Sequence, residues 1–169
     1  MCLYFTLLDW YHDDYPHYGD KNHPMRNNPA YSNEKRDFSR YVEYMHNQVR
    51  EICTNYGKLD ILWFDFSYEN ENYVMRGETW GATELVNMVR ELQPGIIIDN
   101  RLEVSGEGFG SLWECDPTPY HGDFVSPEQI IPPHRLHAQQ GRGQGLEAVL
   151  PMHHNWGLGA QPHILKPAP

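Results

Sequence analysis

The sequence predicts an α/β fold built on a parallel sheet, and its 169 residues correspond to one domain or part of one. Three apolar runs, residues 2–8, 59–64 and 96–98, alternate with two segments of helical periodicity, residues 33–56 and 85–92. Continuous apolar runs separated by helices are typical of parallel strands joined by right-handed crossovers. Each run ends in polar residues, and ligand sites of α/β proteins lie at the carboxyl ends of such strands.

The first run, residues 2–8, reads Cys-Leu-Tyr-Phe-Thr-Leu-Leu and predicts a buried strand that closes on Asp9 and Trp10. Because a domain rarely starts inside a core strand, we expect the sequence to be a piece of a longer protein. The next residues, 12–32, are rich in proline, tyrosine and polar side chains. They predict a long loop with a functional role.

Residues 33–56 give the clearest helix prediction. Apolar side chains recur at three- and four-residue spacing and form one stripe: Phe38, Tyr41, Val42, Met45, Val49, Ile52 and Cys53. Ser32 or Asn33 is expected to cap the start, and Gly57 is placed to end the helix. We interpret the stripe as core packing.

The run Leu59–Phe64 is the strand around which the chain is organised, and it stops abruptly at Asp65. A carboxylate at this place is either a loop cap or a catalytic group. A second helix follows, marked by Leu85, Val86, Met88, Val89 and Leu92, and it must end before Pro94. The third strand, residues 96–98, leads into Asp99-Asn100-Arg101.

Beyond Arg101 the pattern loosens. Residues 123–132 are turn-rich and hold Glu128, and residues 146–152 predict one more strand. The last residues, 159–169, show no period and are expected to be an irregular or disordered tail after a domain that covers residues 1–158.

Composition argues against several classes of function. A formal net charge of -10 disfavours nucleic acid as a partner, because a phosphate backbone requires a basic surface. No stretch approaches the ~20 apolar residues of a membrane span, and no basic stripe favours a membrane surface. Three widely spaced cysteines and ten histidines lack metal-ligand spacing, so we expect no metal site.

Cleavage of a glycosidic bond requires at least two carboxylates, and here carboxylates lie on separate elements with aromatic side chains around them. One carboxylate attacks the anomeric carbon, and the other protonates the leaving oxygen. Retention of configuration requires the two groups to stand about 5–5.5 Å apart, and inversion requires a wider gap. By itself the pattern is weak, because 23 acidic residues offer many such pairs.

Five short motifs, in order, resemble those of the glycoside hydrolase family 29 α-L-fucosidases. Residues 62–65 (Leu-Trp-Phe-Asp) resemble the nucleophile strand, residues 3–10 resemble the preceding strand, and residues 97–101 resemble a strand end that reads Asn-Asn-Arg or Asn-Asp-Arg. Residues 122–129 are similar to Gly-Asp-Phe-x-Thr-Pro-Glu-Gln, and residues 146–157 to Trp-Glu-x-Cys followed by Asn-x-Trp-Gly-Tyr.

This resemblance implies roles for three carboxylates. Asp65 would be the nucleophile, and Glu128 the general acid and then base. Glu147 is a second candidate for the acid, because some family members place that group in the Trp-Glu segment. The alternatives are that Glu128 merely opens a helix, where an acid is favourable, and that Glu147 is a structural buried acid.

The resemblance also implies substrate-binding residues. Tyr4, Trp63 and Trp156 would line the fucose pocket, and Arg101 would hold a sugar hydroxyl or orient Asp65. The alternatives are that Tyr4 and Trp63 are core residues and that Arg101 is a structural ion-pair partner.

The sequence departs from the family pattern in several places. Phe66 stands where glycine usually follows the nucleophile, Leu146 where tryptophan is usual and Leu158 where tyrosine is usual. The family carries fucose-binding histidines on earlier strands, and no residues before Cys2 in this sequence could supply them. The C-terminal β-sandwich of the family is also not expected within this sequence.

The resemblance therefore implies the central and later part of a (β/α)8-like, TIM-type barrel. The parent enzyme would release terminal α-L-fucose from glycans with retention and without a metal or organic cofactor, and would be secreted, periplasmic or lysosomal. Two alternatives stay open: an inactive sugar-binding remnant, and a different barrel hydrolase. Linkage preference, compartment and oligomeric state are not determined by the sequence.

Overall fold

The structure is a computed structural model that describes residues 1–16, 18–20, 23–69, 74–103, 122–125 and 145–146. Its centre is a parallel sheet of three strands in the order β1 (Cys2–Thr6), β2 (Ile61–Asp65) and β5 (Ile97–Ile98). The predicted parallel α/β arrangement is confirmed for these strands. The first strand ends two residues earlier than expected, and the third begins one residue later.

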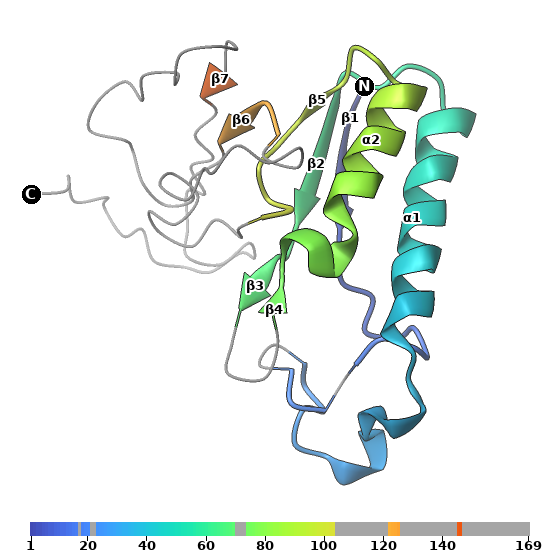
Figure 1. The fold of residues 1–169 in the computed structure, drawn as a ribbon, viewed down its shortest axis with the longest axis vertical. Coiled ribbons are helices and arrows are strands. Elements are labelled where there is room, and N and C mark those ends of the chain that lie inside the picture. The colour runs from blue at the N-terminus through green and yellow to red at the C-terminus, as the bar shows by residue number, and fades with distance from the viewer. Residues whose placement is uncertain (17, 21–22, 70–73, 104–121, 126–144, 147–169) are drawn as a thin grey trace, which may run out of the picture.

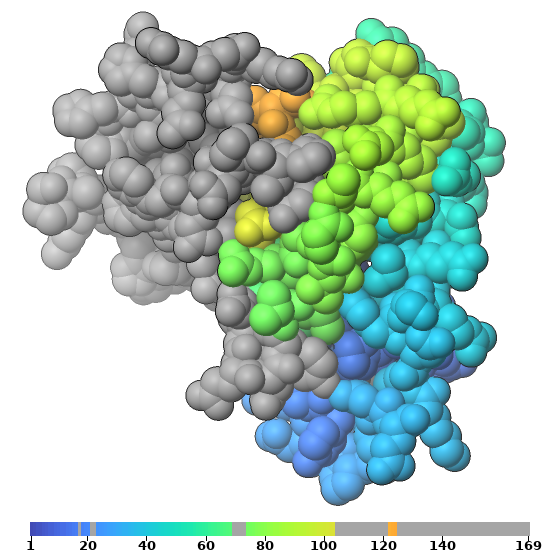
Figure 2. Space-filling view, in the orientation of Figure 1, coloured from blue at the N-terminus to red at the C-terminus, as the bar shows by residue number. Residues whose placement is uncertain are grey.

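Two α-helices, α1 (Phe38–Asn55) and α2 (Ala82–Leu92), pack against each other beside the sheet (Figure 1). The apolar stripes of the two helices pack against the sheet side chains that face them. Together these residues form the core, which includes Leu7, Tyr41, Met45, Val49, Leu62, Phe64, Leu85, Val86, Val89 and Ile98. The interpretation of the first stripe as core packing is confirmed. In Figure 2 the surfaces of the two helices form a continuous layer.

The predicted start of the first helix is wrong by five residues. Asp37 is the N-cap, and its carboxylate accepts the Ser39 amide at 3.1 Å. The residues before it instead form two short 3-10 turns, η1 (Pro29–Tyr31) and η2 (Asn33–Lys35). Ser32, Asn33 and Asp37 all have side chains suited to cap a helix, so the preference for capping residues did not identify which of them begins the helix.

Side chains fix how the helices meet the strands. The Tyr41 hydroxyl donates to the Leu7 carbonyl at 2.6 Å, which ties α1 to the end of β1. The Gln93 amide donates to the Cys53 and Gly57 carbonyls and accepts from the Leu59 amide, so it joins the end of α1 to the approach to β2.

Smaller elements follow the central strands. After β2 come the antiparallel pair β3 (Tyr68–Glu69) and β4 (Val74–Met75) and the 3-10 turn η3 (Gly77–Trp80). Further on, β6 (Phe124–Val125) pairs in parallel with β7 (Gly145–Leu146). A parallel bridge between Asp99 and Phe124 brings β6 beside β5, so five parallel segments lie in the order β1-β2-β5-β6-β7. Of the strand expected at 146–152, only Leu146 lies within the described residues.

The two faces of the central sheet differ. Leu62, Phe64 and Ile98 face the helices, whereas Tyr4 on β1 is 57% exposed and Ile97 on β5 is 44% exposed. Register places Tyr4 beside Trp63, and strand alternation puts both on the face away from the helices. We call this face, with Cys2, Tyr4, Ile61, Trp63, Asp65 and Ile97, the open face.

Candidate active site

Asp65 lies at the carboxyl end of β2 on the open face, and each of its carboxylate oxygens has a partner from a neighbouring strand. The Tyr4 hydroxyl of β1 donates to Oδ2 at 2.6 Å, and Arg101 Nη1, three residues after β5, donates to Oδ1 at 2.9 Å. Asp65 thus meets side chains from the two strands that flank β2, one from within β1 and one from just after β5. The two hydrogen bonds fix its rotation and leave it 14% exposed.

Arg101 is almost completely buried, with 1% of its surface exposed. A buried guanidinium is stable only when it is paired, and Asp65 is its ion-pair partner. The guanidinium also lies over the indole of Trp63, 5.2 Å from the ring centroid. Tyr4 meets the same indole edge-on with centroids 6.3 Å apart. Four residues expected at the site, Tyr4, Trp63, Asp65 and Arg101, therefore lie in one cluster.

A second carboxyl group, Asp99, lies next to this cluster, and no role for it was expected from the sequence. Asp99 is fully buried, and its Oδ1 accepts the backbone amide of Phe64 at 3.0 Å. Burial raises the pKa of Asp99 well above its usual value, and the charge of Asp65 acts in the same direction. Hydrogen bonds from the backbone amides of Phe64 and Arg101, and the charge of Arg101, oppose this rise. The sequence does contain an indication of Asp99, because it is the first of the polar residues, Asp99-Asn100-Arg101, that follow the third predicted strand.

The motif at residues 122–124 has a structural explanation. Gly122 has φ +70°, and a Cβ there would lie 2.0 Å from the Asp99 carbonyl oxygen, so only glycine permits this approach. Asp123 accepts the Ile98 amide through Oδ2 at 2.9 Å and pairs with Arg90 of α2 through Oδ1 at 2.9 Å. Phe124 is buried. These contacts anchor β6 beside β5.

Three of the expected site residues, Glu128, Glu147 and Trp156, lie outside the described residues, as does the 159–169 tail. Asp9 lies three residues after β1, and its carboxylate accepts from the Tyr44 hydroxyl of α1 at 3.5 Å. Of the polar groups expected at the three strand ends, Asp65 and Arg101 are in contact, and the presence of Asp9 beside them stays a prediction.

Phe66, the residue that departs from the family pattern, has an unusual backbone. Its φ of +77° lies in the left-handed region, and among the described residues it is the one non-glycine residue with positive φ. The residue is 43% exposed. Glycine adopts this conformation without steric cost, which explains why glycine suits the position. Strained backbone of this kind is often found at functional sites.

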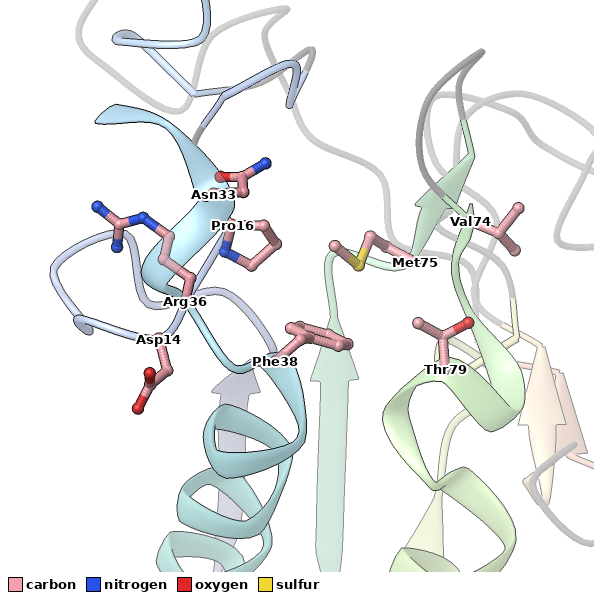
Figure 3. A pocket seen from close by; sticks show the side chains of 8 residues that line it. All are labelled: Asp14, Pro16, Asn33, Arg36, Phe38, Val74, Met75 and Thr79. Carbon is pink, nitrogen blue, oxygen red and sulfur yellow. The ribbon is translucent and has the colours of Figure 1, made fainter. Parts of the chain in front are cut away.

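A cavity of about 310 Å³ lies elsewhere, between the loop that precedes α1 and the β4–η3 segment (Figure 3). Its lining combines polar and apolar side chains: Asp14, Pro16, Asn33, Arg36, Phe38, Val74, Met75 and Thr79. None of these belongs to the Asp65 cluster, so this hollow is separate from the candidate active site.

The described part of the chain holds no group of three or more histidine, cysteine, aspartate or glutamate side chains placed to bind a metal. Within the same residues, no helix has the length and apolar character needed to cross a bilayer.

Comparisons with known proteins agree on one family. The family model described as Alpha-L-fucosidase matches residues 1–161. The solved structure of α-L-fucosidase isoenzyme 1 from Paenibacillus thiaminolyticus matches 96% of this chain with 48% identity and a TM-score of 0.77. A fucosyltransferase mutant of the α-L-fucosidase AlfC from Lactobacillus casei matches 74% of the chain with 24% identity and a TM-score of 0.50, which supports the fold alone.

The chain spans 36% of the length of the Paenibacillus protein and 34% of the AlfC mutant. The search of curated proteins returned no match. Since the family model covers nearly the whole sequence and the Paenibacillus enzyme shares almost half of its residues, the chain belongs to the α-L-fucosidase family.

Proposed function

We propose that Asp65 is the nucleophile of a retaining α-L-fucosidase that releases terminal α-L-fucose from fucosylated glycans. The observation that carries the proposal is the convergence of Tyr4 and Arg101 on the two oxygens of Asp65, at the carboxyl end of a parallel strand. A carboxylate held in this way keeps its geometry while a bond forms to one of its oxygens.

The reaction would proceed in two displacements. An Asp65 oxygen attacks C1 of fucose while the bond from C1 to the glycan oxygen breaks, and an acid residue gives its proton to that oxygen. The resulting carboxylate then takes a proton from water, the water oxygen attacks C1, and the ester to Asp65 breaks. The fucose product has the configuration of the substrate.

Glu128 is our first candidate for the acid and base, and Glu147 the second. Support for Glu128 comes from the segment before it, because Gly122, Asp123 and Phe124 anchor β6 beside the strand that ends near Arg101. Since β6 runs parallel to β5 and β2, its carboxyl end lies at the same edge of the sheet as Asp65.

The sugar would rest on the open face. Trp63 offers an indole to the apolar side of fucose and Trp156 is the second aromatic candidate, while Tyr4 and Arg101 offer polar groups beside Asp65. The five parallel segments in chain order support a wider arrangement in which residues 1–158 form the central part of a (β/α)8 barrel. In that arrangement the open face turns toward the barrel interior.

Release of nitrophenol from 4-nitrophenyl α-L-fucoside tests the proposal. We expect the parent chain to release nitrophenol and Asp65→Asn, which keeps the shape and removes the nucleophile, to be inactive. Activity in Asp65→Asn equal to the parent would refute the assignment of Asp65. Fucose binding without turnover in the parent would instead favour the sugar-binding remnant.

The acid is assigned with two further variants. Azide needs no acid assistance to accept the fucosyl group, so it should restore turnover of an activated fucoside in the variant that lacks the acid–base residue. We expect rescue of Glu128→Ala and none for Glu147→Ala. The reverse result would give the role to Glu147.

A further inference from the structure

The side chain of Asp99 occupies a point where two strands of the sheet separate. Ile97 and Ile98 pair with Ile61 and Leu62 in register, but the next residue, Asp99, bridges to Phe124 on the other side. The backbone of β5 thus turns from β2 toward β6. Across the gap, Asp99 Oδ1 accepts the Phe64 amide at 3.0 Å, so a side-chain oxygen takes the place of a backbone acceptor.

The second oxygen of Asp99 indicates the form of the carboxyl group. Oδ2 is buried and has no hydrogen-bond partner within the described residues. A buried carboxylate with one oxygen unsolvated is strongly disfavoured, whereas the neutral acid avoids a buried charge. The upward shift of the Asp99 pKa, caused first by burial, points the same way.

Charged groups around Asp99 are already paired with one another. Asp65 pairs with Arg101, and Asp123, which packs from the β6 side, pairs with Arg90. A second negative charge at Asp99 would compete with Asp65 for Arg101. A neutral Asp99 leaves the Arg101 guanidinium to Asp65.

We propose that Asp99 is a positioning residue of the candidate active site: as a neutral carboxylic acid it ties the end of β5 to β2 at Phe64, one residue before Asp65. The same bond sets where Arg101, two residues after Asp99, meets the carboxylate. The effect on catalysis rests on the proposed role of Asp65. The protonation state of Asp99 and its hydrogen bond with the Phe64 amide do not depend on that role.

Two measurements test the state and the tie without any activity. The first is urea unfolding of the parent and of Asp99→Asn from about pH 4 to 8, with Asp13→Asn, which removes an exposed carboxylate, as the control. The folded parent keeps a proton on Asp99 that the unfolded chain releases above about pH 4. The contribution of this proton to the free energy of unfolding is fully present below this pH and is lost as the pH rises. The free energy of unfolding of the parent should therefore fall with pH relative to that of Asp99→Asn. Equal pH dependence of the two proteins would overturn the neutral state.

The second measurement is hydrogen exchange of the Phe64 amide. Asp99→Ala removes the acceptor and should speed exchange at Phe64 by about tenfold or more. Asp99→Asn keeps an oxygen at the same place and should preserve the protection. Unchanged protection in Asp99→Ala would overturn the tie.

Kinetics on 4-nitrophenyl α-L-fucoside then test the consequence for Asp65. Asp99→Ala should lower kcat by roughly 10- to 100-fold with a smaller change in KM, because the reacting carboxylate is misplaced. Asp99→Asn should recover most of that loss and leave the acidic limb of the pH–rate profile in place. A loss in Asp99→Asn as deep as in Asp65→Asn, or an acidic limb moved to lower pH, would overturn the positioning role. A parent without activity would refute the proposed function, while the unfolding and exchange results would still decide the inference about Asp99.

Discussion

Replacing Phe66 by glycine tests whether the backbone beside the proposed nucleophile is strained. A residue with a Cβ in the left-handed region costs about 1–2 kcal/mol, and Phe66 has φ +77°. Glycine removes that cost but loses about 0.5–1 kcal/mol through the greater freedom of the unfolded chain. It also loses the contacts of the ring, and because the residue is 43% exposed these contribute roughly half of the 1.5–3 kcal/mol for a fully buried phenylalanine.

These contributions largely cancel in Phe66→Gly, so its free energy of unfolding should fall by no more than about 1.5 kcal/mol. Phe66→Ala is the decisive control, since it loses the ring as well but keeps the Cβ and therefore the strain. We expect Phe66→Gly to be more stable than Phe66→Ala by about 1 kcal/mol in urea unfolding. If the alanine variant is as stable as the glycine variant, the strain argument is wrong.

Four other changes follow from single contacts. Tyr4→Phe removes the hydroxyl that donates to the proposed nucleophile and keeps the ring, so kcat on the nitrophenyl fucoside should fall about tenfold with little change in stability; an unchanged rate would contradict this. Arg101→Leu breaks a buried ion pair and should lower the free energy of unfolding by about 3–5 kcal/mol in a urea titration, whereas a loss below 1 kcal/mol would show that the pair is not buried in solution. Asp37→Ala removes the cap of α1 and should cost about 1 kcal/mol by thermal unfolding, with Asp37→Asn closer to the parent; equal losses would place the effect elsewhere. Gly122→Ala forces a Cβ against the Asp99 carbonyl, and the Ile98 amide should lose protection from hydrogen exchange if β6 is displaced.

Local sequence patterns were sufficient to predict the parallel sheet and the two helices. The stripe from Phe38 to Cys53 could be assigned to the core because helical periodicity is a property of neighbouring residues. The start of that helix could not, because Ser32, Asn33 and Asp37 are all good caps. The structure uses Asp37, whose carboxylate accepts the Ser39 amide.

Part of the site was also within reach of the sequence. Residues that follow adjacent parallel strands meet, and this places Arg101 near Asp65, whereas Tyr4, in the middle of β1, was expected there only from the family resemblance. The sequence marked Asp99 as part of a polar strand end, but the role proposed for it could not be predicted, because that role depends on the place where β5 turns from β2 to β6. The conformation of Phe66 was equally hidden, since a bulky residue gives no local sign of positive φ.

The open face has a consequence for engineering. A designer who wished to make the open face more soluble would first replace its exposed apolar side chains Tyr4 and Ile97 by charged ones. The Tyr4 hydroxyl also donates a hydrogen bond to Asp65, and the indole of Trp63 beside it packs against the Arg101 guanidinium. Solubility and chemistry therefore compete for the same positions. For this chain by itself, Ile97 is the place to begin such a redesign, because it contributes to the face and not to the carboxylate; in a complete barrel it would face the interior and would be kept apolar.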